Sequence, residues 1–191
     1  MNKHTQNDEE LMLRIAEGDE HAFEILVERH QTHVLNLIYR FLGDRTKSQD
    51  LAQEVFLRVW RAAGDYKPKA KFTTWLYRIA ANLCLNELKS ARRKKWLRFF
   101  QADTDEQNSG ENDFSDSSPS PEDLLLSKER TIEITNALQS LPENQRMALI
   151  LKRYDDLSYE EIARVLNCSV SAVESLIVRA KKNLQEKLKI L

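Results

Sequence analysis

The side chains best suited to chemistry in this sequence are a run of cations with aromatic residues close by. Residues 89–98 include no acidic residue and six basic ones: Lys89, Arg92, Arg93, Lys94, Lys95 and Arg98. A helix C-terminus attracts cations through its dipole, but six in ten residues exceed what one dipole needs. Trp75, Tyr77 and Trp96 add aromatic faces nearby. Cations beside stacking surfaces suit single-stranded or melting DNA, so the sequence favours nucleic-acid contact.

Catalytic and metal-binding patterns are weak by comparison. His30 and His33 lie three residues apart with Glu28 nearby, a spacing that could hold a metal ion. No fourth ligand or second cluster accompanies them, which favours surface or half-buried histidines. The chain has no phosphate-binding glycine loop and no plausible nucleophile–base pair. We therefore expect no enzymatic activity, no metal, no cofactor and no small-molecule substrate.

Residues 157–188 carry the pattern of two helices joined by a tight turn. Ser158 and Glu161 form a capping box, in which the hydroxyl accepts an N–H and the carboxylate bonds back. Asn167 tolerates the left-handed turn conformation, and Ser169 can cap the second helix. The apolar positions of that helix recur at spacings of three and four: Val173, Ile177, Ala180, Leu184 and Leu188. The pattern fits either a core hairpin or a helix-turn-helix, whose second helix enters a DNA major groove.

The first hundred residues predict a helical domain of their own. Asp19 can cap a long helix that Gly43 ends. Residues 46–49 (TKSQ) have the form of a second capping box that opens the next helix. Thr73 or Thr74 can then cap a third helix, which runs into the basic segment.

Charge divides the chain into three parts. Residues 1–100 carry 18 Lys and Arg against 13 Asp and Glu, residues 101–127 none against eight, and residues 128–191 11 against nine. The middle part is also poor in apolar side chains before Leu124, so we expect a flexible acidic linker. The linker is either a solvated spacer, or its carboxylates occupy a basic channel that otherwise holds nucleic acid. The sequence leaves both possibilities open.

Composition agrees with a helical protein in two parts. With 41% hydrophobic and 31% charged residues but only four glycines and four prolines, the sequence predicts an all-α fold of two small helical domains. No apolar run is long enough to span a membrane, and the first ten residues lack the apolar core of a signal peptide. Cys84 and Cys168 stand alone, as expected of reduced thiols in a cytoplasmic protein.

Four segments in order complete the pattern: residues 50–60 (DLAQEVFLRVW), 72–94, 140–166 and the turn and helix that follow. Together they resemble the bacterial extracytoplasmic-function (group IV) RNA polymerase sigma factors of the sigma-70 family. The resemblance implies sigma region 2 in residues 1–100 and sigma region 4 in residues 128–191. It also implies an alternative sigma factor that binds RNA polymerase core, recognises −10 and −35 promoter elements and assists DNA melting.

The resemblance implies partners and contact residues as well. The expected partners are promoter DNA, the polymerase (the clamp helices of its largest subunit and the flap of its second-largest subunit) and an anti-sigma factor. The expected core-polymerase contacts are Asp50, Gln53, Glu54, Phe56 and Leu57. The expected −10 contacts are Lys67, Lys69, Lys71, Trp75, Tyr77, Arg78, Asn82, Lys89, Arg92, Arg93 and Lys94. The expected −35 contacts are Ser169, Ser171, Ala172, Glu174, Ser175, Val178, Arg179 and Lys182.

Two of these regions carry specific expectations. We expect Asn82 to read an extruded −10 base, because its amide offers a donor and an acceptor together, with residues 67–71 walling the pocket. Trp75 could join that pocket or be ordinary core. Many family members have basic residues where this chain has Glu174 and Leu176. Glu174 could accept a hydrogen bond from cytosine, and Leu176 could touch a thymine methyl group or pack on protein.

Two other interpretations fit part of the pattern. One is a helix-turn-helix repressor or activator that binds an operator without polymerase core, and the segment from Asp50 to Leu57 speaks against it. The other is a protein-only adaptor, such as a decoy that sequesters a regulator, and the basic run at residues 89–98 speaks against that.

Overall fold

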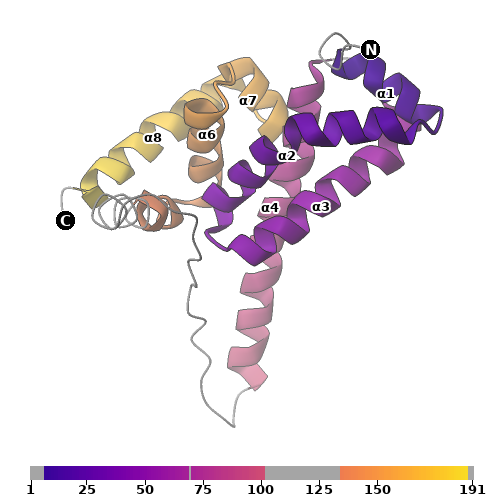
Figure 1. Cartoon of the computed structure of the whole chain (residues 1–191). Coiled ribbons are helices and arrows are strands. Elements are labelled where there is room, and N and C mark those ends of the chain that lie inside the picture. Colours follow the sequence, from indigo (N-terminus) through magenta and orange to yellow (C-terminus); the bar gives the residue numbers. More distant parts are fainter. Residues whose placement is uncertain (1–6, 69, 102–133, 189–191) are drawn as a thin grey trace, which may run out of the picture.

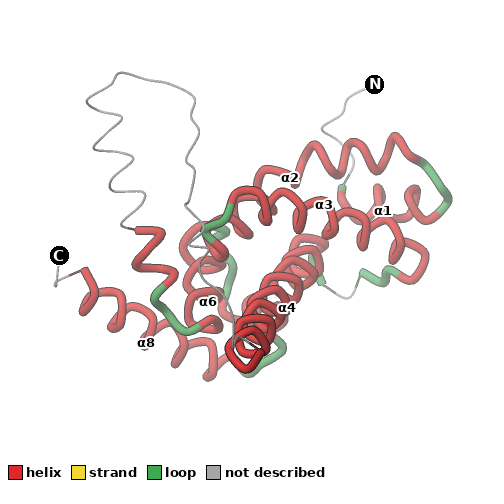
Figure 2. Tube along the Cα trace, turned by 90° about the horizontal axis from the view of Figure 1, so that it is seen from below, coloured by secondary structure: helices red, strands yellow, loops and turns green. Residues whose placement is uncertain are grey.

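All regular elements among the described residues are helices, joined by short loops, which confirms the all-α prediction (Figures 1 and 2). The computed structural model describes residues 7–68, 70–101 and 134–188. The expected linker at residues 101–127 lies outside the described residues except for Gln101, and so does Lys69.

Within residues 7–68 and 70–101, the N-terminal part contains four α-helices and one short 3-10 turn. Their bounds are α1 Asp8–Ala16, α2 Glu20–Leu42, α3 Arg45–Ala62, η1 Ala63–Asp65 and α4 Phe72–Gln101. Helices α2, α3 and the first half of α4 pack on one another, and α1 closes one end of them. The second half of α4 projects away from the other helices (Figure 1). The sequence had indicated no helix before Gly18, so α1 is an addition.

Two of the expected helix ends are confirmed in α2. The Asp19 carboxylate accepts a hydrogen bond from the Ala22 N–H at 3.0 Å, which caps the first turn. Gly43 ends the helix in the left-handed conformation, with φ of 74°, and its N–H bonds the Tyr39 carbonyl at 2.7 Å.

The predicted capping box at residues 46–49 is wrong. Helix α3 begins two residues earlier than that box implies, at Arg45, and Asp44 rather than Thr46 is its N-cap, accepting from the Lys47 N–H at 3.0 Å. Thr46 lies inside the first turn, and the Ser48 hydroxyl donates to the Asp44 carbonyl. Asp44 is the cap because the turn at Gly43 leaves its backbone extended. In that conformation its carboxylate reaches the free N–H groups of the first helical turn.

The predicted threonine cap of α4 is also wrong. The helix begins at Phe72, whose N–H donates to Glu9 Oε1 of α1 at 3.2 Å. Thr74 is buried in the first turn instead. The capping acid comes from 63 residues away, so no local pattern could indicate it.

The C-terminal part confirms the helix-turn-helix pattern. Residues 134–139 are helical and precede α6 Glu143–Tyr154, α7 Tyr159–Leu166 and α8 Val170–Leu188. Ser158 and Glu161 make both bonds of the capping box, at 2.8 and 3.2 Å. Asn167 turns the chain with φ of 52°, and the Ser169 hydroxyl accepts the Ala172 N–H at 3.2 Å.

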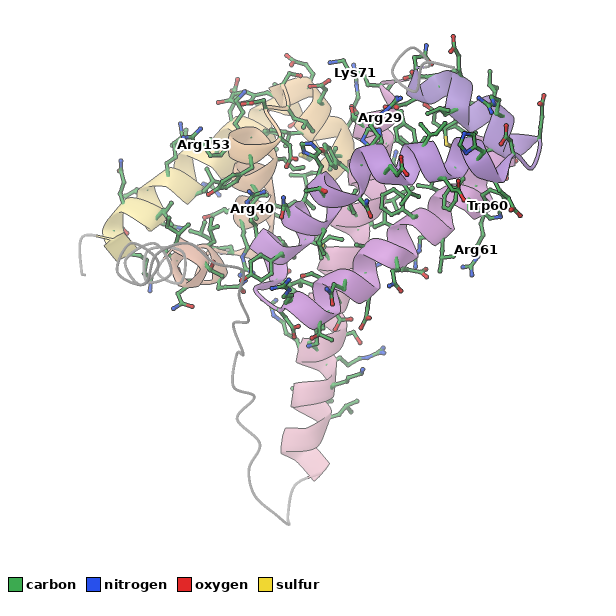
Figure 3. All side chains as sticks on the ribbon, viewed as in Figure 1. Arg29, Arg40, Trp60, Arg61, Lys71 and Arg153 are labelled. Atoms are coloured by element: carbon green, nitrogen blue, oxygen red, sulfur yellow. The ribbon has the colours of Figure 1, made fainter. Side chains whose placement is uncertain are left out.

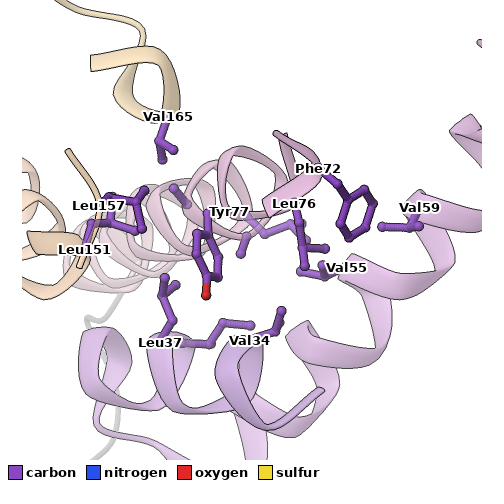
Figure 4. Packing of buried hydrophobic residues seen from close by; sticks show 14 of the residues in the cluster. Val34, Leu37, Val55, Val59, Phe72, Leu76, Tyr77, Leu151, Leu157 and Val165 are labelled. Carbon is purple, nitrogen blue, oxygen red and sulfur yellow. The ribbon is translucent and has the colours of Figure 1, made fainter. Parts of the chain in front are cut away.

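The two helical parts pack against each other. Helix α7 lies on α4, and α6 lies on α2. Leu151, Leu157 and Val165 from the C-terminal part face Tyr77 and Leu37 from the N-terminal part, all within one continuous apolar cluster (Figure 4). The DNA-facing candidates of both parts are therefore positioned by one shared core.

Candidate functional site

A pocket of about 280 Å³ opens between the loop after η1 and the start of α4. Its lining residues are Tyr66, Lys67, Ala70, Thr74, Trp75 and Arg78, joined by Arg164 from α7. The Tyr66 and Trp75 rings meet edge-on with centroids 5.1 Å apart, and Phe72 supports both rings from behind. The pocket thus combines an aromatic wall with cations at its rim, which suits a stacked nucleotide.

Tyr66 is a residue that the sequence reasoning missed. Its hydroxyl is buried and has no hydrogen-bond partner among the described residues. Burial, together with the nearby acids Glu9 and Asp8, raises its pKa, so the hydroxyl stays protonated. A protonated hydroxyl can both donate and accept a hydrogen bond. The sequence signal that could have identified Tyr66 as a candidate is its place directly before the lysine-rich loop of residues 67–71.

Helix α1 holds the pocket wall from behind. Asp8 lies 2.9 Å from His30 Nε2 and also pairs with Arg29, while the His30 ring packs on Phe72 at 5.3 Å. Burial alone would raise the pKa of Asp8, but the hydrogen bond and charge of His30, with those of Arg29, hold it below its usual value. His30 therefore belongs to the support of the pocket.

The other expected −10 residues fall into three groups. Lys67, Trp75 and Arg78 line the pocket. The exposed cations Lys89, Arg92, Arg93 and Lys94 follow α4 into its projecting half. Asn82 is exposed one turn beyond Arg78 and does not line the pocket.

Tyr77 and Lys71 are engaged by the C-terminal part. Tyr77 is only 6% exposed. Its burial, and then the charge of the Asp155 carboxylate to which its hydroxyl is hydrogen-bonded, raise the pKa of the tyrosine. Lys71 Nζ lies 2.8 Å from Glu161 Oε1, and Figure 3 shows the lysine beside the C-terminal helices.

A second candidate site is a groove of about 780 Å³ between α2 and α3. More of its surface is apolar than polar. The apolar lining residues are Phe23, Val27, Leu35, Ala52, Phe56 and Leu57, and the polar ones are Gln31, Thr32, Gln49, Asp50 and Gln53. Leu57 is 47% exposed and lines this groove, so a partner bound there would cover it. A long apolar groove with polar edges suits a partner helix.

The groove brings together four of the five expected polymerase contacts. Asp50, Gln53, Phe56 and Leu57 line it. Glu54 does not, because its carboxylate turns to Arg58 Nε at 2.8 Å within α3.

The third candidate site is the exposed face of α8. Val173, Ile177 and Ala180 are buried, and the opposite side carries the residues expected at the −35 element. Ser171, Glu174, Ser175, Val178, Arg179 and Lys182 are exposed there, Ala172 is partly exposed, and Ser169 stands at the N-cap. Leu176 is partly buried against the core, so it packs on protein.

Two other kinds of site find no support. Within the described residues, no group of three or more His, Cys, Asp or Glu side chains is arranged to hold a metal ion. None of the helices in the described ranges combines the length and apolar character needed to cross a membrane.

Comparison with known sequences supports the assignment of both parts. Residues 26–94 match the family model described as Sigma-70 region 2, and residues 131–184 match that described as Sigma-70, region 4. The RNA polymerase sigma-H factor of Pseudomonas aeruginosa is 38% identical over 183 residues, 96% of this chain and 94% of that protein. The ECF RNA polymerase sigma-E factor of Escherichia coli K12 is 36% identical over 186 residues, 95% and 94% of the two chains.

Solved structures agree on the fold. CnrH, in complex with the cytosolic domain of CnrY, matches with a TM-score of 0.70 at 24% identity, over 96% of this chain and 97% of that one. The sigma factor RpoE of Bartonella quintana, in complex with the anti-sigma factor NepR, gives 0.61 at 22% identity, over 88% and 97%. By these matches of sequence along nearly its whole length, the chain belongs to the extracytoplasmic-function sigma factors of the sigma-70 family.

Proposed function

We propose that this sigma factor divides its work among three surfaces. The groove between α2 and α3 binds the clamp helices of the polymerase, the pocket beside Trp75 takes an extruded −10 base, and the exposed face of α8 reads the −35 element. Residues 1–100 then act as region 2 and residues 128–191 as region 4. The observation that carries the proposal is the pocket, because the rings of Tyr66 and Trp75 and the cations Lys67, Arg78 and Arg164 come together there.

The pocket supports base capture on physical grounds. Extruding a base from a duplex costs its stacking and pairing energy, which a pocket must offset by new stacking and edge contacts. Trp75 and Tyr66 supply aromatic rings that line the pocket and contact each other. The cations along α4, Lys89 to Lys94, hold the strand by its phosphates, which adds affinity without sequence information.

The groove supports docking of a helical partner. Its apolar floor with Phe56 and Leu57, and its polar rim with Asp50 and Gln53, match the chemistry of a helix-in-groove interface. Because Glu54 is paired with Arg58, we assign it to the edge of this interface.

We further propose an anti-sigma factor as a regulator. The solved relatives include a sigma factor in complex with NepR, which is named as an anti-sigma factor. By the same similarity to known sigma factors, we propose that this chain acts with the polymerase in the cytoplasm. The polymerase, and not this chain, then catalyses RNA synthesis.

Transcription in vitro tests the proposal as a whole. Purified core polymerase is combined with this chain on a genomic library of promoter fragments, and transcript start sites are mapped. Specific starts that depend on both components support a sigma factor. A chain that binds duplex DNA but starts no transcripts is a repressor or activator, and a chain that does neither is an adaptor.

A further inference from the structure

We propose that Glu174 selects a cytosine in the −35 element, and that Val178 adds a preference for a thymine about two base pairs away. The inference rests on the proposed reading of the −35 element by the exposed face of α8. It deepens that function by naming the class of DNA sequence that this face accepts.

The first part of α8 presents a reading face without cations. The exposed side chains of residues 170–178 are three or four positions apart, so they share one side of the helix. They are Ser171, Glu174, Ser175 and Val178. None of residues 170–178 is Lys or Arg. Because the N-terminal residues of a recognition helix contact the base edges, these four side chains determine what α8 reads.

Packing fixes the direction in which this face points. On the opposite side of α8, Val173 is 0% and Ile177 2% exposed. Farther along, Asn183 Nδ2 donates a hydrogen bond to Gln145 Oε1 of α6 at 2.9 Å. Helix α8 thus packs against α6 and α7 and is anchored on both (Figure 1). A side chain on an anchored helix reaches a base edge with defined geometry, so Glu174 has a defined place in the groove.

The Glu174 carboxylate has no cation to neutralise it. Glu174 is exposed, and its side chain makes no ion pair or hydrogen bond within the part of the chain that the structure describes. The positions three and four residues before and after it are uncharged: Val170, Ser171, Ile177 and Val178. An uncompensated carboxylate that approaches the phosphates lowers affinity for every DNA sequence. A base edge that donates a hydrogen bond to the carboxylate offsets this loss.

Cytosine is the base that meets this need. A carboxylate only accepts hydrogen bonds. In the major groove cytosine presents its N4 amino group, a donor, whereas guanine presents the acceptors N7 and O6, and thymine the acceptor O4. Adenine has an amino group beside the acceptor N7, so its edge attracts and repels the carboxylate together. Glu174 therefore favours cytosine over the other three bases.

Val178 is the second residue of this face that distinguishes bases. The hydroxyls of Ser171 and Ser175 donate and accept, so they suit any base edge. Val178 is 66% exposed, and an apolar side chain in the major groove contacts the methyl group of thymine. Val178 follows Glu174 by one helical turn, about 6 Å along the axis. For a helix that follows the groove, this rise corresponds to about two base pairs.

Selection of −35 sequences by the complete polymerase tests this inference. The probe is a duplex promoter fragment from the mapped start sites, with the base pairs around −35 randomised. Core polymerase and each full-length chain are incubated with the probe, and the bound fraction is sequenced. Glu160→Gln is the matched control, because it removes an exposed carboxylate from α7 and gives the same net charge as Glu174→Gln.

The unmodified chain and Glu160→Gln should both enrich a cytosine at one position. Glu174→Gln should lower that enrichment roughly fivefold or more and raise that of adenine, because an amide pairs with adenine N6 and N7. Glu174→Arg should favour guanine at the same position, because a guanidinium pairs with O6 and N7. Val178→Ser should lose the neighbouring thymine and keep the cytosine.

Three results would contradict these expectations. Cytosine that stays enriched in both Glu174 variants, or that the unmodified chain never enriches, would overturn the inference while other selected base pairs still support −35 reading by α8. An equal gain in affinity for all sequences, with the same bases enriched, would place Glu174 beside phosphates only and would also overturn it. If the unmodified chain enriches no base pair around −35, the proposed function of α8 itself is wrong.

Discussion

The edge of the Tyr66 ring meets the Trp75 ring with centroids 5.1 Å apart, and the tyrosine hydroxyl has no partner among the described residues. A buried hydroxyl without a protein partner lowers stability unless a water or a ligand satisfies it. On the proposed function, an extruded base of the −10 element reaches this surface. We therefore propose that Tyr66 shares or takes the base-reading role that the sequence analysis expected of Asn82.

Tyr66→Phe separates folding from DNA opening. The change removes an unsatisfied hydroxyl, so the free energy of unfolding should stay equal or rise slightly. Open-complex formation should fall by roughly tenfold, because reading one base by hydrogen bonds is worth about 1–3 kcal/mol. Permanganate footprinting of a promoter, beside urea titration of the free protein, measures both quantities.

Asn82→Ala serves as the comparison for that prediction. Asn82 is exposed on α4 and lies outside the pocket, so we expect a smaller loss of open complex than for Tyr66→Phe. On a template that is already melted at −10, the protein no longer has to unpair the strands. The open-complex defect of Tyr66→Phe that comes from unpairing should therefore disappear. A larger defect in Asn82→Ala would return the base-reading role to the amide.

Leu57→Asp tests the groove between α2 and α3. Leu57 is 47% exposed in the free protein, so a charge there should leave folding intact. In an interface the same charge loses its solvation, which we expect to weaken core-polymerase binding by at least tenfold. Leu13→Asp is the matched control, because Leu13 is 62% exposed on α1 and outside the groove. Equal affinities of the two variants in a titration with core would place the polymerase elsewhere.

Asp8 gives the fold a defined dependence on pH. Its pKa is lowered in the folded state, so its contribution is fully present above the ordinary carboxyl range and is lost as pH falls through the folded pKa. Asp8→Asn should cost on the order of 1–2 kcal/mol at pH 7, and this difference should shrink below about pH 4. Urea titrations at several pH values, with exposed Glu17→Gln as control, measure it. A difference that stays constant with pH would mean that Asp8 acts by packing alone.

Local patterns in the sequence were sufficient for the helix-turn-helix and insufficient for the ends of α3 and α4. The capping box at Ser158 and the turn at Asn167 involve neighbours within a few residues, and both are confirmed. The N-terminus of α4 is satisfied by Glu9, which is distant in sequence. Sequence spacing describes neighbours along the chain, so contacts that depend on tertiary packing lie beyond it.

The same limit applies to the candidate sites. The exposed face of α8 and most of the groove could be predicted from helical periodicity. Apolar residues at spacings of three and four mark the buried face of a helix, and the remaining positions mark its exposed face. The unpartnered hydroxyl of Tyr66 depends on how a loop folds against α1 and α4, and the Lys71–Glu161 pair on how two regions meet. Neither has a periodic signal.

The exposed face of α8 should govern duplex capture rather than strand opening. Arg179 and Lys182 are exposed on the side opposite Val173 and Ile177, whereas Lys181 is exposed between those sides. Replacing Arg179 and Lys182 by alanine should weaken binding at the −35 element and reduce the slope of log affinity against log salt by about one per lost phosphate contact. Lys181→Ala should change that slope less.

A template melted in advance at −10 should not rescue the double variant, since strand opening is not the step it loses. Filter binding across a salt series, on duplex and on melted templates, measures each effect. Rescue of the double variant by melting, or an equal slope change in Lys181→Ala, would show that this face of α8 does not read the −35 element.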